Sequence, residues 1–200
     1  MQLKNYDQLF FRQRRELAEL FGFETRNKYE ILDGEKKVVG FAAEKRLGIL
    51  DFIFRQYLGH WRPFEIQIFS PDRQLEIRAK HPFRLFFQRL EIFGAAGERL
   101  GAIEQRFALF SKRFVVQSAA GHALLEVSSP IWRLWTFPFL KDGRERAVVA
   151  KRWNGLLSEM FTDRDNFAIH FVDRSLTEEE RRLILGAALF IDLQYFEKKA

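Results

Sequence analysis

The sequence predicts a mainly β fold, in which a closed antiparallel β-barrel encloses one hydrophobic carboxyl-terminal helix, and three observations support this prediction. Turn-forming residues separate short alternating or β-branched runs along most of the chain. Phenylalanine, which packs well in strands and cores, occurs 23 times in 200 residues, so a β-rich interior is expected. A helix near the carboxyl end carries an uninterrupted apolar run, and such a helix must be surrounded on every side.

The composition is that of one folded domain with a basic surface. Hydrophobic residues make up 47% and charged residues 30% of the chain. The net charge of +6 favours anionic partners, namely lipid headgroups, phosphoinositides or nucleic acid, although a mildly basic soluble surface would carry the same charge. Cysteine is absent, which excludes disulfides, thiolate metal sites and S-palmitoyl anchors. The first twenty residues lack the apolar segment of a secretory signal, so a cytoplasmic protein, peripheral at a membrane if it binds lipid, is expected.

Residues 7–20 are predicted to form an amphipathic helix that precedes the barrel. An apolar face and an arginine-rich polar face recur there at helical spacing. The apolar face contains Leu9, Phe10, Leu17 and Leu20. We therefore expect an amino-terminal extension over residues 1–20 and a barrel domain over residues 21–200.

Five β-hairpins are predicted next, each formed by two strand-like runs joined by a turn that contains Gly or Asp. The turns are centred on Asp33-Gly34, Pro71-Asp72, Gly97, Gly121 and Asp142-Gly143. Closure of this meandering sheet into a barrel would remove its exposed edges. Two segments break the pattern. Residues 47–59 are predicted to form a short helix over a barrel end, or else a membrane-touching loop, and residues 151–161 a short packing helix.

The helix predicted over residues 177–196 is the enclosed one. Overlapping capping boxes begin at Ser175 and Thr177. The apolar run over residues 183–191 is shorter than the ~20 residues of a membrane span, so no transmembrane span is expected. Small residues within this run suit close packing inside a barrel. Asp192 follows the run and is expected to pair with a base or to reach solvent.

Several long segments of the sequence resemble one known family. They are GFETRNKYEI at 22–31, FAAE at 41–44, RPFEIQIF at 62–69, KRWNGLLSEMFTDRDNFAIHF at 151–171 and LILGAALFIDLQYFE at 183–197. The chain is similar to the phospholipid scramblases of the tubby-like superfamily. This resemblance implies a closed barrel of about twelve strands around a hydrophobic helix. It also implies association with membranes and acidic lipids and, in some members, calcium-dependent movement of phospholipids between leaflets.

The same resemblance places a proposed calcium loop at residues 163–174. Asp163 and Asp165 fit the first and third positions of an EF-hand loop. Later positions do not fit, because Phe167 replaces an oxygen ligand and Arg174 stands where a bidentate acid is required. The match to a calcium loop is therefore confined to its first residues.

Period-two alternation in this stretch indicates a strand instead of a metal loop. Phe167, Ile169 and Phe171 would form its buried face. We interpret TDRDN as a turn that leads into this strand, since Asp and Asn side chains bond the nearby backbone in turns. Weak calcium binding through Asp163 and Asp165, joined by Asp173, is the alternative, and no other cofactor is expected.

Basic residues interleaved with phenylalanine form the candidate lipid-binding site. They precede or lie within the segment HPFRLFFQRLEIF, or open a later strand, and they are Arg78, Lys80, Arg84, Arg89, Lys112 and Arg113. An anionic membrane surface would select this combination, although solvated strand ends would also carry such residues. In the family that the chain resembles, a cysteine cluster that carries acyl anchors stands in this region, and Phe and Arg replace it here.

The predicted function is that of a scramblase-like protein that binds acidic phospholipids or phosphoinositides at a membrane surface, with phospholipid scrambling as a further activity. The alternative is a non-enzymatic module that binds a protein or nucleic acid through a basic face. An enzyme is not expected, because the four histidines are scattered and no nucleophile motif occurs. The sequence leaves the oligomeric state open.

Overall fold

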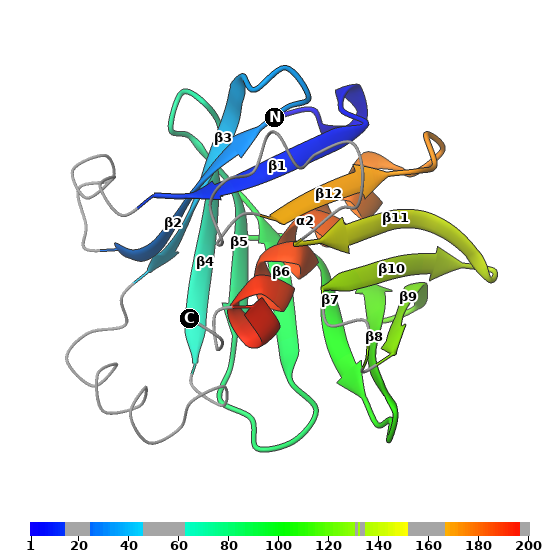
Figure 1. Cartoon of the computed structure of the whole chain (residues 1–200). Coiled ribbons are helices and arrows are strands. Elements are labelled where there is room, and N and C mark those ends of the chain that lie inside the picture. Colours follow the sequence, from blue (N-terminus) through cyan, green and yellow to red (C-terminus); the bar gives the residue numbers. More distant parts are fainter. Residues whose placement is uncertain (15–24, 46–62, 131, 133–134, 152–166, 197–200) are drawn as a thin grey trace.

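The computed structural model describes residues 1–14, 25–45, 63–130, 132, 135–151 and 167–196. Within these residues twelve strands form a closed antiparallel barrel around one α-helix, as predicted (Figure 1). Each strand pairs with its neighbours in sequence, and β1 closes the barrel by pairing with β12. The strands are β1 (Gln8–Gln13), β2 (Thr25–Leu32), β3 (Val38–Lys45), β4 (Phe64–Phe69), β5 (Leu75–His81), β6 (Arg89–Gly94), β7 (Arg99–Arg106), β8 (Ser111–Ser118), β9 (Ala123–Pro130), β10 (Thr136–Lys141), β11 (Arg144–Ala150) and β12 (Phe167–Phe171).

The amino-terminal segment is a strand, so the helix predicted for residues 7–20 is wrong where the structure describes it. β1 pairs with β2 on one side and with β12 on the other. Leu9 and Phe11 lie in the barrel interior, whereas Phe10 packs on the outer face with Ala168 of β12. Because both faces of β1 are covered, its apolar residues are adjacent in sequence and do not show the alternation of a half-buried strand. β1 is therefore part of the barrel wall and not of an extension.

The five predicted hairpins are confirmed. They join β2 to β3, β4 to β5, β6 to β7, β8 to β9 and β10 to β11, so all five turns lie at one end of the barrel, here named the turn end. Gly97 and Gly121 adopt φ angles of 89° and 87°, which only glycine accommodates without strain. The segments 47–59 and 151–161, for which helices were predicted, lie outside the described residues.

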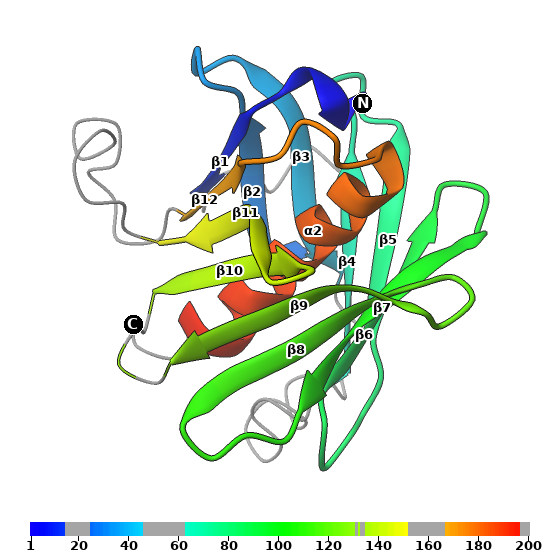
Figure 2. The same cartoon turned by 90° about the vertical axis from the view of Figure 1, so that its right-hand side faces the viewer.

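The other end of the barrel, here named the loop end, carries the connections β5–β6, β7–β8 and β9–β10. The first two of these connections lie at the lower edge of both Figure 1 and Figure 2. Loops at this end are longer than tight turns, and loops positioned by a rigid scaffold commonly carry function.

The helix α2 (Glu178–Ile191) passes through the interior of the barrel (Figure 2), which confirms the predicted enclosed helix. A capping box starts it, since the Thr177 hydroxyl accepts from the Glu180 amide and the Glu180 carboxylate accepts from the Thr177 amide. Burial would raise the pKa of Glu180, but hydrogen bonds from Lys141 and Thr177 hold it below its ordinary value.

Close packing surrounds the middle of α2. Every residue from 183 to 191 is buried. Gly186 permits the approach of β6, because a Cβ atom there would lie 2.8 Å from Cδ1 of Ile92. The π-helical turn η4 (Asp192–Phe196) continues the chain to the predicted end of the helix at the loop end of the barrel.

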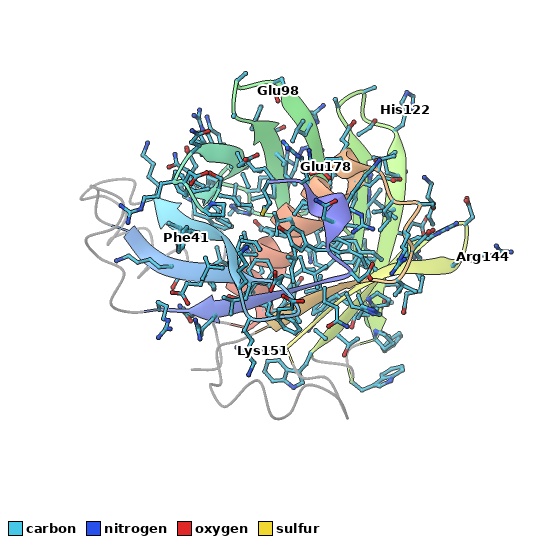
Figure 3. The ribbon with its side chains drawn as sticks, turned by 90° about the horizontal axis from the view of Figure 1, so that it is seen from above. Phe41, Glu98, His122, Arg144, Lys151 and Glu178 are labelled. Carbon is cyan, nitrogen blue, oxygen red and sulfur yellow. The ribbon has the colours of Figure 1, made fainter. Side chains whose placement is uncertain are left out.

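Arg181 closes the turn end of the barrel from within. Its side chain is among the largest that are fully buried. Its guanidinium donates to the carbonyl oxygens of Leu3 (3.2 Å) and Tyr6 (2.7 Å). The guanidinium also lies 4.5 Å from the ring centre of Phe171. Burial lowers the pKa of Arg181. Figure 3 shows Glu178 beside the short 3₁₀-helix η1 (Leu3–Asn5), where its carboxylate accepts from the Leu3 amide (3.0 Å).

Candidate functional site at the loop end of the barrel

The outer wall of β5 and β6 carries three of the predicted basic residues. Arg78 and Lys80 occupy alternate positions of β5, so both side chains point outward. The Arg78 Nε atom lies 3.7 Å from Glu65 Oε1, and Lys80 Nζ lies 5.7 Å from the ring centre of Phe93. Arg89 donates to Glu104 Oε2 at 2.6 Å. Arg78 and Arg89 are thus engaged by carboxylates of the wall, whereas Lys80 is exposed.

Lys112 and Arg113 are neighbours on β8 and therefore face opposite sides of the barrel wall. Lys112 points inward, and its Nζ atom lies 5.1 Å from the ring centre of Phe137 and 4.5 Å from that of Tyr195. Burial raises the pKa of Tyr195 to about 12, so this ring stays a neutral phenol beside the ammonium group. Arg113 is exposed on the outside. The structure therefore does not bring these two residues together into one patch.

Arg113 faces a second arginine that the sequence analysis did not identify. In the β7–β8 pair it lies directly opposite Arg106, and both side chains are exposed. Arg106 Nη1 lies 3.6 Å from Glu104 Oε1, but Glu104 also accepts from Arg89. Like charges placed directly opposite each other destabilise a sheet unless an anion lies between them. The register of the β7–β8 strand pair is what reveals these two facing arginines.

Eight large apolar side chains are exposed on the three connections of the loop end. Five of them are more than seven-tenths exposed, with Phe86 at 79% and Trp132 at 76%. We name this set the apolar rim, and it consists of Phe83, Leu85, Phe86, Phe87, Phe107, Leu109, Phe110 and Trp132. In the described part of the chain, one further large apolar residue is exposed to this degree, Val172, which follows β12 at the turn end. Apolar exposure on this scale marks an interaction surface.

Hydrogen bonds hold the β5–β6 loop in the shape that exposes its phenylalanines. Gln88 Nε2 donates to the Arg84 carbonyl oxygen (2.9 Å), and the Gln105 amide donates to the Gln88 carbonyl oxygen (2.8 Å). Phe87 adopts a φ of 52°, a conformation that aromatic residues rarely take. Arg84, another of the six predicted basic residues, is half-buried within the loop. The loop is therefore shaped to direct apolar residues outward although this arrangement strains its backbone.

The predicted calcium ligands fall in two parts of the molecule. Asp163 and Asp165 lie outside the described residues, so calcium binding there stays a prediction. Asp173 accepts from the Ser175 amide (2.7 Å) and from the Arg146 guanidinium, and these contacts lower its pKa to about 2. Within the described residues no group of three or more potential ligands could hold a metal ion.

The strand predicted after the calcium-like segment is confirmed as β12. Phe167 is buried and stacks on Phe11 with ring centres 4.3 Å apart. Arg174, which occupies the position of an acidic ligand, instead donates to Asp7 Oδ2 at 2.8 Å on the surface. An exposed pair of this kind contributes little to stability.

Two polar side chains, one of the four histidines and the aspartate that follows the apolar run, are buried inside the barrel. His81 stacks between the rings of Phe64 (4.6 Å) and Phe190 (5.6 Å), a packing role. Asp192 is 4% exposed, so of the two environments expected for it, contact with a base or with solvent, the solvent one is excluded. Its carboxylate accepts a hydrogen bond from the Tyr29 hydroxyl at 2.7 Å.

The fold and this site define a class of protein, a barrel filled by its own helix with a basic and apolar loop end. The sequence profile of the Scramblase family matches residues 1–198. The chain therefore belongs to the scramblase family. No solved structure matches the chain significantly.

Several relatives match almost the whole chain. Bovine (Bos taurus) phospholipid scramblase 2 is 31% identical over 210 residues, which cover 98% of this chain and 70% of that protein. Human (Homo sapiens) phospholipid scramblase 1 is 33% identical over 210 residues, covering 98% of this chain and 64% of that protein. A phospholipid scramblase family protein of Schizosaccharomyces pombe is 24% identical, covering 98% and 61%. None of the helices in the described residues has the length and apolar character needed to cross a bilayer.

Proposed function

We propose that this chain binds anionic phospholipids at a membrane surface, phosphoinositides among them, and takes part in the movement of phospholipid between leaflets. The observation that carries the proposal is the presence of exposed cationic and exposed apolar side chains at the same end of the barrel. The names of the relatives, which are phospholipid scramblases, support the same function.

Three of the predicted basic residues are available to lipid headgroups: Lys80, Arg84 and Arg113. In the part of the chain that the structure describes, no carboxylate lies within ion-pair distance of any of them. Each Lys or Arg near an anionic leaflet contributes about 1 kcal/mol, so three would raise partitioning roughly a hundredfold. Because this contribution is electrostatic, added salt would reduce it.

Co-sedimentation with vesicles tests the proposal. We expect the chain to bind vesicles that contain phosphatidylserine or a phosphoinositide, and to bind neutral phosphatidylcholine vesicles much less. Binding should be the same with calcium and with chelator, since the proposal uses no metal ion. Absence of binding to every vesicle would refute the proposal, and binding that competitor DNA abolishes would favour a nucleic-acid module instead.

A matched pair of charge reversals shows whether the loop end is the binding surface. Arg113→Glu and Arg144→Glu change the net charge equally, but Arg144 is exposed at the turn end of the barrel (Figure 3). We expect Arg113→Glu to weaken binding to anionic vesicles about tenfold or more and Arg144→Glu to leave it close to that of the unmodified chain. Equal effects would show that net charge alone determines binding.

Participation in scrambling needs a separate measurement. The chain would be reconstituted in vesicles that contain a headgroup-labelled fluorescent lipid, and dithionite would then bleach the outer leaflet. We expect the bleached fraction to exceed that of protein-free vesicles. A bleached fraction equal to the protein-free value would refute scrambling by this chain and leave lipid binding standing.

A further inference from the structure

The most exposed apolar residues of the chain lie on three neighbouring loops. Phe86 is 79% exposed, Phe107 72%, Leu109 and Phe110 73%, and Trp132 76%. The β5–β6 loop adjoins the end of β7, since the Gln105 amide donates to the Gln88 carbonyl oxygen. The β7–β8 and β9–β10 loops are neighbours, since Ser111, after the first, pairs with Pro130, before the second. The exposed side chains therefore form one continuous apolar surface and are not isolated from one another.

The apolar rim has no space to turn into the barrel. The interior behind it is filled, because Phe190 of α2 and Tyr195 of η4 pack against Phe64, Phe114 and Phe137 at this end. Within the part of the chain that the structure describes, the rim is therefore presented outward, and an external apolar medium or partner would bury it.

The charges behind the rim indicate a lipid bilayer as that medium. Arg106 immediately precedes Phe107, and Arg113 follows Phe110 by three residues on β8. At ~3.3 Å per strand residue, Arg113 lies about 10 Å behind the tip of this loop. Amphipathic elements bury their apolar faces about 5–10 Å into the boundary between headgroups and acyl chains. The arginine pair would then lie at the level of the lipid phosphates.

We propose that the apolar rim inserts into the membrane interface, so that the barrel stands on the bilayer by its loop end with Arg106 and Arg113 bound to lipid phosphate. This inference rests on the proposed function, because it specifies how the chain meets the anionic membrane. A phosphate between the two guanidinium groups would also relieve the repulsion of the facing like charges. The aromatic side chains supply the apolar contact that a purely electrostatic association lacks.

Single cysteine labels give a direct test, since the chain contains no cysteine of its own. Phe86→Cys and Leu109→Cys place an environment-sensitive fluorophore on two loops of the rim, and Val172→Cys places it at the turn end as a control. On addition of phosphatidylserine vesicles we expect a blue shift and a rise in emission at the two rim positions. A spin label carried on the upper acyl chain of the lipid should quench both, and the Val172→Cys label should change little.

The outcomes separate insertion from surface binding. If the labelled proteins sediment with vesicles but neither rim label responds, insertion is refuted and the proposed function stands. If none of the proteins sediments with any vesicle, both are refuted. A response at Val172→Cys equal to that at the rim would refute the end-on orientation.

An unlabelled variant provides a second readout. Phe107→Ser with Phe110→Ser should lower partitioning onto phosphatidylserine vesicles by about tenfold per residue, because the apolar contact is lost. Both residues are exposed, so the thermal melting temperature should hardly change. Val172→Ser is the matched control. Unchanged vesicle binding by the double variant, at an unchanged melting temperature, would overturn the inference.

Discussion

Substitution of Leu189 by aspartate tests whether α2 is a core element of the barrel. Leu189 lies in the middle of the enclosed helix and is 0% exposed. Leu185 and Gly186, one turn before it, are buried and uncharged, and Asp192, three residues after it, is acidic. No cation of the helix therefore lies within one turn of the new carboxylate. The variant therefore combines the loss of a buried leucine with the introduction of a buried charge.

The expected cost is comparable to the whole free energy of unfolding of a typical domain. Removal of the leucine side chain alone costs about 2–5 kcal/mol, the range for Leu→Ala in cores. An uncompensated buried charge adds about 3–5 kcal/mol. The sum of roughly 5–10 kcal/mol compares with a total of about 5–15 kcal/mol for folding, so Leu189→Asp should be largely unfolded at neutral pH.

Circular dichroism during urea denaturation measures the loss of stability, and Leu189→Ala is the milder variant for comparison. Leu189→Ala should remain folded and lose about 2–5 kcal/mol in the free energy of unfolding. Burial would raise the pKa of the new carboxyl in the folded state, so its penalty should diminish as the pH falls below that pKa. A folded Leu189→Asp variant of nearly native stability that lost only membrane binding would refute the enclosed helix.

Three further substitutions test other parts of the structure. Gly186→Val should lower the free energy of unfolding by about 1–3 kcal/mol in urea titrations, because the added side chain meets Ile92; an unchanged midpoint would contradict this packing. Arg181→Met should destabilise the chain by about 1–3 kcal/mol in the same titration, since the carbonyl oxygens of Leu3 and Tyr6 lose a donor. Asp173→Asn should be less stable than the unmodified chain at neutral pH. Because the pKa of Asp173 is lowered from 3.8 to about 2, the stability difference should persist above pH 4 and shrink as the pH falls towards 2; a pH-independent difference between melting temperatures would contradict it.

The elements with strong local signals were predictable from the sequence. Glycine turns such as Gly97 and Gly121 mark hairpins because the turns need positive φ angles. The capping box at Thr177 and the apolar run after it determine an enclosed helix, since a short helix that is apolar all round has no other stable position. β1 was not predictable in this way. Its apolar residues face both the interior and a second cluster outside, and this double burial depends on strands distant in sequence.

The candidate site was predictable in composition but not in arrangement. The sequence identified the phenylalanine-rich segment and its basic neighbours, yet register and strand direction decide which charges are available. Strand alternation directs Lys112 inward and Arg113 outward. Carboxylates on neighbouring strands engage Arg78 and Arg89, and the facing position of Arg106 follows only from the pairing of β7 with β8.

The most direct test of the central claim is co-sedimentation of the unmodified chain with phosphatidylserine vesicles in the presence of chelator, with phosphatidylcholine vesicles as the reference. We predict strong binding to the anionic vesicles without calcium, because exposed arginines and the apolar rim provide the contact. Equal and negligible sedimentation with both kinds of vesicle would contradict the claim that the loop end of this barrel binds anionic membranes.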